Sequence, residues 1–225
     1  RDGVTSISEF KEMGYTAEAL TNYMALLGWS VTEGMTERFS LQEAASAFTL
    51  DRVNKAGAKF DWDKLNWLNA QVIHDWSPKV LLEELKPLWE KEGWTLPNDD
   101  WGLSLAKLIG PSMTFLKDGI EQSRPFFEEP ILKADSIHQL QIEGSKTAIK
   151  CLLEHLKETP WDGLDPEIAK ELINKSAKSA GVKKGLVMKS LRACLLGCMQ
   201  GPDLMITWSL LARIRQDFDR LCKCI

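Results

Sequence analysis

Apolar residues recur along most of this chain at the spacing of an α-helix. In the segment 17–27, Ala19, Leu20, Tyr23 and Leu27 place apolar side chains on one helical face. No segment alternates between apolar and polar residues for long enough to predict a β-strand. The pattern predicts an all-α protein of short helices, at 7–13, 17–27, 41–47, 101–109, 113–127, 148–157, 166–180 and 206–222, with two more starting after Asp61 and at Pro78.

Residues that cap helices mark several of these starts. Ser6 and Ser40 are each followed three residues later by a glutamate, which is the capping-box arrangement. Asp61 can accept hydrogen bonds from the free N–H groups of the helix that follows it. Residues 160–163 predict a turn, whereas 133–142 fits neither pattern and stays open.

Charge is distributed unevenly along the 225 residues. The chain has 28 Lys and Arg against 32 Asp and Glu, a net charge of −4. From Lys170 onward, however, eleven basic residues stand against four acidic ones. This end of the chain is therefore a candidate surface for a polyanion.

Neither a membrane span nor a signal peptide is evident in the sequence, so we expect a cytoplasmic protein. Five cysteines without a paired spacing argue against a disulfide framework. Cys194 and Cys198 lie four residues apart but lack a nearby histidine pair to complete a zinc site. We expect buried free thiols and no bound metal.

Catalytic motifs are missing as well. The three histidines lie far apart in the sequence, and neither a glycine-rich phosphate loop nor a G-x-S-x-G motif occurs. We therefore expect no catalysis by this chain alone.

Two segments carry candidate binding chemistry. Arg192 stands alone in an apolar run, where its permanent charge needs a partner: a phosphate or base edge, or alternatively a helix C-terminus or carboxylate of its own chain. The segment 54–69 interleaves lysines with Trp62 and Trp67, which suits a ribose-phosphate surface. Alternatively, Trp67 only anchors its helix in the core.

Four sequence blocks resemble one family, the bacterial glutamyl-tRNA synthetases in their cyanobacterial form. Residues 20–30 are similar to the family's N-Y-x-A-L-L-G-W signature, and residues 52–69 resemble its R-V-[SN]-K-x-x-A-x-F-D block with K-L-x-W-x-N. Residues 188–204 look like its P-L-R-x-x-L-T-G and G-P-x-L block, with Ser190 in place of the proline. Arg1 resembles the last residue of the K-x-S-K-R loop, which would give it a catalytic role and imply that a further segment precedes it.

The resemblance implies an elongated tRNA-binding part of a class I aminoacyl-tRNA synthetase, with a stem-contact domain at 1–75 and helical anticodon-binding domains at 76–127 and 128–225. It implies that the parent enzyme uses ATP with magnesium to load glutamate on tRNA(Glu), that the nucleotide-binding domain with its H-I-G-H element lies upstream, and that this part needs no cofactor. We further expect a monomer that does not bind membranes. The alternative is a helical scaffold for a protein partner.

The resemblance also assigns residues to the RNA. It places Lys64, Trp67 and Asn69 on the inner face of the tRNA L and Arg192 and Leu204 near the anticodon, and it implies further tRNA contacts at Lys55 and Gly201. Family members that accept only tRNA(Glu) read the third anticodon base with an arginine, and the matching position here is Ser112, or Gly110 if the alignment slips by two residues. Because neither is arginine, we expect a non-discriminating enzyme that also charges tRNA(Gln).

Overall fold

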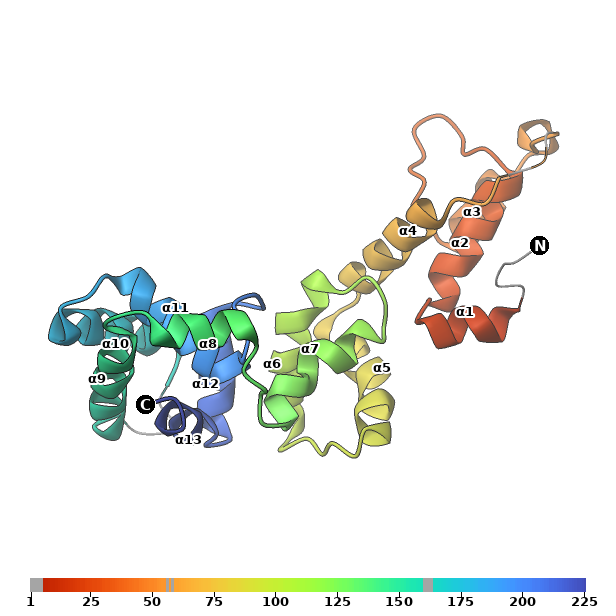
Figure 1. Ribbon diagram of the computed structural model, residues 1–225. Helices are drawn as coiled ribbons and strands as arrows, with labels where there is room; N and C mark the ends of the chain where they lie inside the picture. Colours follow the sequence, from red (N-terminus) through yellow and green to blue (C-terminus); the bar gives the residue numbers. More distant parts are fainter. Residues whose placement is uncertain (1–5, 56, 58, 160–163) are drawn as a thin grey trace. The chain divides into compact units, whose positions relative to one another are not determined.

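The prediction of an all-α protein is confirmed by a computed structural model that describes residues 6–55, 57, 59–159 and 164–225 (Figure 1). Across these residues the only β-type pairing is an isolated bridge between Trp29 and Val53. The helices are α1 (Ile7–Met13), α2 (Ala17–Gly28), α3 (Leu41–Ala47), η1 (Leu50–Arg52), α4 (Trp62–Asp75), α5 (Pro78–Lys91), α6 (Asp99–Ile109), η2 (Gly110–Ser112), α7 (Asp118–Phe127), α8 (Ala134–Gln141), α9 (Ser145–Lys157), α10 (Pro166–Ala180), α11 (Lys184–Leu196), α12 (Leu204–Arg213) and α13 (Asp217–Cys222).

The chain divides into two compact units. The first comprises Arg1–Gly93 and Ile109–Glu121, and the second comprises Trp94–Leu108 and Gln122–Ile225. The division of the sequence into three domains stays a prediction. The predicted turn at 160–163 lies outside the described residues.

The first unit is organised around α4, which packs against α2 and against the short turn η2. Its core gathers Phe10, Tyr15 and Tyr23 from the first two helices with Leu65 and Leu68 from α4. These leucines lie three residues apart, so the apolar spacing along α4 buries one face and leaves the other for solvent.

Capping interactions begin the helices where the sequence predicted. Ser6 Oγ accepts from the backbone N–H of Glu9, and the Glu9 carboxylate accepts from Ser6 N–H at 2.9 Å. The same reciprocal pair joins Ser40 and Glu43. Asp61 Oδ1 accepts from Lys64 N–H at 3.0 Å and so fixes the start of α4.

The expected helix 113–127 is wrong in its first part, because α7 begins only at Asp118. The Asp118 carboxylate accepts hydrogen bonds from the backbone N–H groups of Thr114 and Phe115, both at 2.8 Å. Satisfying these two donors with a side chain holds 113–117 as a loop instead of a helical turn.

The expected helix 206–222 is likewise two helices, α12 and α13. Arg215 between them has a φ of 59°, in the left-handed region that ends helices. Its backbone N–H donates to Ala212 O, and the N–H of Gln216 donates to Leu211 O. The chain therefore turns sharply before α13.

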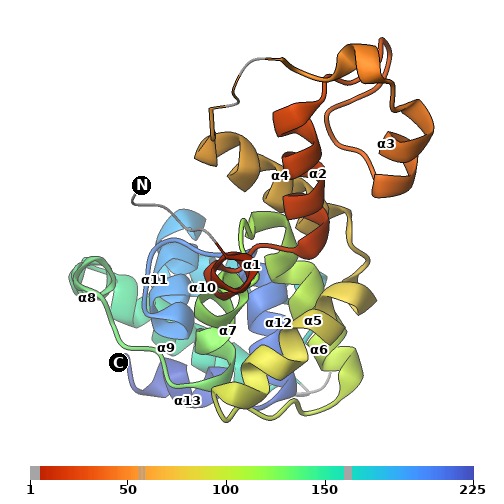
Figure 2. The ribbon, with the colours of Figure 1, turned by 90° about the vertical axis from the view of Figure 1, so that its right-hand side faces the viewer.

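In the second unit α9 packs against both α10 and α11, as both ribbon views show (Figures 1 and 2). The segment that the sequence left open contains α8. The buried Gln139 of α8 donates to Ser190 Oγ of α11 at 3.3 Å, which gives Ser190 a structural role. His155 Nδ1 lies 3.0 Å from Ser176 Oγ and so joins α9 to α10.

The thiols are less uniform than we expected. All five cysteines are free, but only Cys194 is buried and Cys222 is exposed. No group of three or more potential metal ligands occurs among the described residues. None of the described helices has the length and apolar character of a membrane span.

Candidate nucleic-acid interface

A basic pocket of about 420 Å³ opens beside the N-terminal end of α4 in the first unit. It contains the predicted Lys55 and Lys64, and also Lys59, which the sequence analysis did not single out. Lys55 and Lys59 are exposed and have no acidic partner among the described residues. The pocket therefore presents at least two uncompensated positive charges to solvent, a suitable environment for a phosphate.

Backbone contacts to the end of α2 hold the loop that carries these lysines. Asn54 N–H donates to Gly28 O at 2.9 Å, and Ser30 Oγ donates to Asn54 Oδ1 at 3.1 Å. The Arg52 side chain donates to Val31 O at 2.8 Å. Because the loop is fixed on both sides of Val53, Lys55 begins from a defined backbone position.

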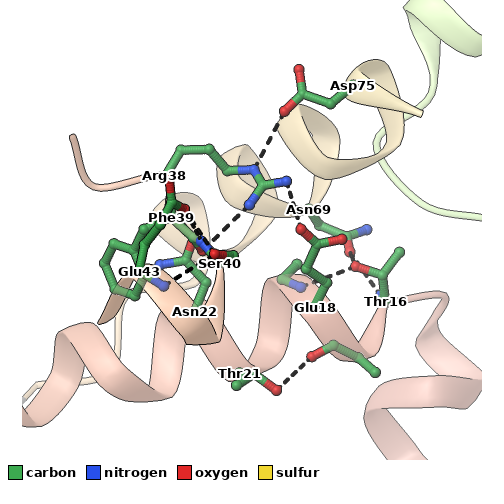
Figure 3. A network of polar contacts seen from close by, with 12 residues as sticks. Thr16, Glu18, Thr21, Asn22, Arg38, Phe39, Ser40, Glu43, Asn69 and Asp75 are labelled. Atoms are coloured by element: carbon green, nitrogen blue, oxygen red, sulfur yellow. Dashed lines mark hydrogen bonds and ion pairs between the residues drawn. The ribbon is translucent and has the colours of Figure 1, made fainter. Parts of the chain in front are cut away.

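Lys64 differs from the other two lysines because its Nζ lies 2.6 Å from Glu37 Oε1. The buried Asn22 holds the Glu37 segment: its amide donates to Glu37 O at 2.9 Å and accepts from Phe39 N–H at 3.1 Å. Figure 3 shows Asn22 beside Phe39, with Arg38 reaching toward Asp75. Glu37 thus orients Lys64 and also offsets part of its charge, a contact between residues 27 apart that the sequence did not reveal.

Trp67 lies one turn after Lys64 on α4, and its side chain is 47% exposed. This exposure rejects the alternative in which Trp67 only anchors α4 in the core, a role that Leu65 and Leu68 fulfil. An exposed indole beside lysines can stack on an unpaired base or a ribose.

The position of Asn69 corrects the expectation that it contacts RNA, because its side chain is 0% exposed. Its Oδ1 accepts from Thr16 N–H at 2.8 Å and from the Thr16 hydroxyl at 3.1 Å (Figure 3). Its amide donates to Thr114 O at 2.6 Å and to Gly14 O at 3.3 Å. Asn69 therefore joins α4 to the start of α2 and to the loop after η2.

The turn η2 resolves which of the two candidate specificity positions can carry a long side chain. Gly110 is buried, and a Cβ atom there would lie 2.7 Å from Leu81 Cδ2. Ser112 is exposed, and its hydroxyl donates to Ile109 O at 2.8 Å. An arginine fits at position 112 but not at position 110.

In the second unit, Arg192 is half-buried and donates from Nη1 to Pro202 O at 3.0 Å. Desolvation lowers the pKa of Arg192, and the nearby Asp203 opposes this shift. The guanidinium still remains charged at neutral pH. A carbonyl of its own chain thus satisfies one donor, as the structural alternative proposed, and the guanidinium has further donors for a ligand.

Two other predicted contacts near Arg192 cannot act through side chains. Leu204 is 4% exposed and begins α12 inside the core, so its side chain does not reach RNA. Gly201 is exposed with a φ of 148°, and a Cβ atom would lie 3.3 Å from Arg192 Nη1. Glycine therefore leaves room for the arginine, and only its backbone can contact a ligand.

Exposed lysines also surround the turn between α10 and α11. The predicted basic end of the chain accounts for them, although no motif singled them out: Lys175, Lys178, Lys183, Lys184 and Lys189. They supply positive charge without a fixed geometry, which suits phosphate contacts that do not read sequence. Arg1, the predicted catalytic residue, lies outside the described residues.

Two family models match the chain. The model of the anticodon binding domain matches residues 80–216, and the model of the catalytic domain of class I tRNA synthetases (E and Q) matches residues 1–67. Together the two matches include all the candidate interface residues.

Individual relatives and a solved structure extend these matches. The glutamate–tRNA ligases of Prochlorococcus marinus strain MIT 9313 and Parasynechococcus marenigrum strain WH8102 are 63% and 61% identical to the chain over its whole length. The chain spans 47% of each, about half of their length. A crystal structure of a glutamate tRNA ligase from Elizabethkingia meningosepticum, in complex with its amino acid, is 27% identical, with a TM-score of 0.87 over 98% of this chain and 44% of that one.

Proposed function

From the premise that the chain belongs to the anticodon binding domain family, we propose that it is the tRNA-binding C-terminal part of a glutamate–tRNA ligase. In this proposal residues 1–75 contact the tRNA stem, and residues 76–127 and 128–225 bind the anticodon region. The match of residues 80–216 to the anticodon binding domain is the observation that carries the proposal. We further propose that the protein acts as a monomer in the cytoplasm.

The chain's own residues would bind RNA in two ways. Lys55 and Lys59 attract phosphates to the pocket beside α4, while Trp67 offers a stacking surface one turn away from Lys64. In the second unit, the exposed lysines around the α10–α11 turn provide charge, and Arg192 provides directed donors. Phosphate contacts supply affinity, whereas an arginine with free donors can hydrogen-bond an unpaired base.

The parent enzyme would use ATP and magnesium to activate glutamate. The described residues do not fit these groups, because they contain no cluster of three carboxylates or other ligands for a metal ion. The role of this chain is therefore to bind and orient tRNA, and no step of the activation is assigned to it.

Acceptance of tRNA(Gln) as a second substrate is also part of the proposal. Ser112 is the exposed residue of η2, and its short side chain carries no guanidinium to read a base. Loss of a base-reading arginine removes about 1–3 kcal/mol of discrimination, by analogy with base contacts in duplexes.

Filter binding of tRNA(Glu) at a series of salt concentrations tests the proposal. The association constant should fall linearly on a log–log plot, because each contacted phosphate releases counterions. In the Lys55→Gln/Lys59→Gln variant the slope should become shallower by about 1.4–1.8, at about 0.7–0.9 per phosphate contact. The Lys79→Gln/Lys91→Gln variant, altered on α5 outside the pocket, is the matched control and should keep the original slope. Binding that does not depend on salt would reject the proposal.

A further inference from the structure

Cys194 and Cys224 meet inside the second unit, although they lie 30 positions apart in the sequence. Cys194 lies on α11 and is 2% exposed, whereas Cys224 follows α13 and is partly exposed. The Cys194 thiol donates a hydrogen bond to the Cys224 sulfur, so the two sulfur atoms are neighbours in the folded chain.

A rigid anchor brings the two cysteines together. The buried Arg220 of α13 donates from Nη1 to Leu195 O at 2.6 Å and from Nη2 to Glu128 O at 2.9 Å. Leu195 is adjacent to Cys194, and Cys224 N–H donates to Leu221 O at 3.2 Å, which continues the turn after α13. The encounter of the thiols is therefore built into the packing of α13 on α11.

The two thiols differ in reactivity. The hydrogen bond from Cys194 and the charge of Lys146 on α9 lower the pKa of the Cys224 thiol, while burial opposes this effect. The hydrogen bond to Cys224 and burial raise the pKa of Cys194. A partly exposed thiol with a lowered pKa beside a buried thiol resembles an attacking and a resolving cysteine.

We propose that Cys194 and Cys224 are a reversible disulfide site, oxidised by low-molecular-weight disulfides such as oxidised glutathione. The Cys224 thiolate attacks one sulfur of oxidised glutathione, forms a mixed disulfide and releases one glutathione thiolate. Cys194 then loses its proton, attacks the Cys224 sulfur and expels the second glutathione. In total, two protein thiols are oxidised, one glutathione disulfide is reduced, and the two thiol protons end on the two glutathione molecules.

The disulfide would tie the segment after α13 to α11 and close a loop that contains α12 and α13. Because a cross-link restricts the unfolded chain, the melting temperature of the oxidised protein should rise by about 5–15 °C. Reduction with dithiothreitol should reverse the rise.

Peptide mapping can identify the pair. The chain is incubated with glutathione redox buffers, quenched with acid and N-ethylmaleimide, and digested with trypsin without reduction. Cleavage after Lys223 separates Cys222 from Cys224, and cleavage after Arg192 and Arg213 gives a peptide that contains Cys194 and Cys198. We expect this peptide to be linked to residues 224–225, with the bond assigned to Cys194 by fragmentation.

Single substitutions complete the test. In Cys194→Ser the mixed disulfide should persist on Cys224, and in Cys224→Ser the buried Cys194 should remain unmodified. Cys222→Ser is the matched control, because Cys222 is exposed and only two residues from Cys224, and it should form the disulfide normally. If Cys194→Ser lowers the melting temperature of the reduced protein, Cys194→Ala replaces it and should also trap the adduct. A cross-link through Cys222 or Cys198, or no cross-link in the unaltered chain, would overturn the proposal.

Discussion

Asn69 is the most connected polar residue of the first unit, and its replacement by alanine should destabilise this unit strongly. The variant loses the two hydrogen bonds that Asn69 accepts from Thr16 and the two that it donates to Gly14 O and Thr114 O. A buried hydrogen bond contributes about 0.5–1.5 kcal/mol, and a buried group left without a partner costs about 1–3 kcal/mol. We therefore expect a loss of about 3–5 kcal/mol in the free energy of unfolding.

Hydrogen exchange at the Thr16 amide measures this effect locally. This N–H donates to Asn69 Oδ1 at 2.8 Å, so in Asn69→Ala it should exchange about a hundredfold faster or more, since each 1.4 kcal/mol corresponds to tenfold. Urea denaturation followed by circular dichroism gives the global value. Gln71→Ala, a change on the same helix, is the control and should stay within about 0.5 kcal/mol of the unaltered chain. A loss below about 1 kcal/mol in Asn69→Ala, with unchanged exchange at Thr16, would refute this reasoning.

Three other predictions follow from single side chains. Trp67→Ala should weaken tRNA binding about 5- to 150-fold in filter assays, from the loss of about 1–3 kcal/mol of stacking, yet change the unfolding free energy by less than about 1 kcal/mol; unchanged affinity would count against a stacking role. Ser112→Arg should favour tRNA(Glu) over tRNA(Gln) in competition binding without loss of stability, whereas Gly110→Arg should destabilise the protein by clashing with Leu81; equal preference in Ser112→Arg would contradict the specificity proposal. Burial raises the pKa of Asp217, so its stabilising contribution is fully present below the ordinary Asp value near 4 and is lost as the pH rises through the folded-state pKa. Denaturation from acid to neutral pH should therefore show Asp217→Asn gaining stability relative to the unaltered chain as the pH rises, and a constant difference would contradict this.

Local signals predicted the helices well. The capping boxes at Ser6 and Ser40 and the cap at Asp61 act over three residues, and the structure confirms each of them. The errors occurred where a local preference is overridden, as at Asp118, whose carboxylate binds the preceding loop, and at Arg215, which takes a left-handed conformation.

The candidate site was predictable in its charges and less so in its geometry. Lys55 and Lys64 fall in a pocket as the motif indicated, and Lys59 could have been added because it lies in the same segment. Asn69, in contrast, is buried by partners up to 55 residues away, and Lys64 is paired with Glu37 from a different loop. No spacing rule in the sequence reveals such long-range contacts.

The resemblance to glutamyl-tRNA synthetases is confirmed by the comparisons with cyanobacterial ligases. The motifs could identify the family because they combine residues with different physical roles. In one block Trp67 is exposed whereas Asn69 is buried, so the block preserves both a surface and the support beneath it. Which residue has which role became clear only from the fold.

Hydroxyl-radical footprinting of tRNA(Glu) by this chain tests the central claim, that two separate surfaces of one helical protein bind a single folded RNA. We predict protection at the inner corner of the tRNA and at the anticodon loop. Lys55→Gln/Lys59→Gln should remove protection at the corner alone, and Arg192→Gln should remove it at the anticodon alone. Absence of protection at either place in the unaltered chain, or loss of both together in each variant, would contradict the account.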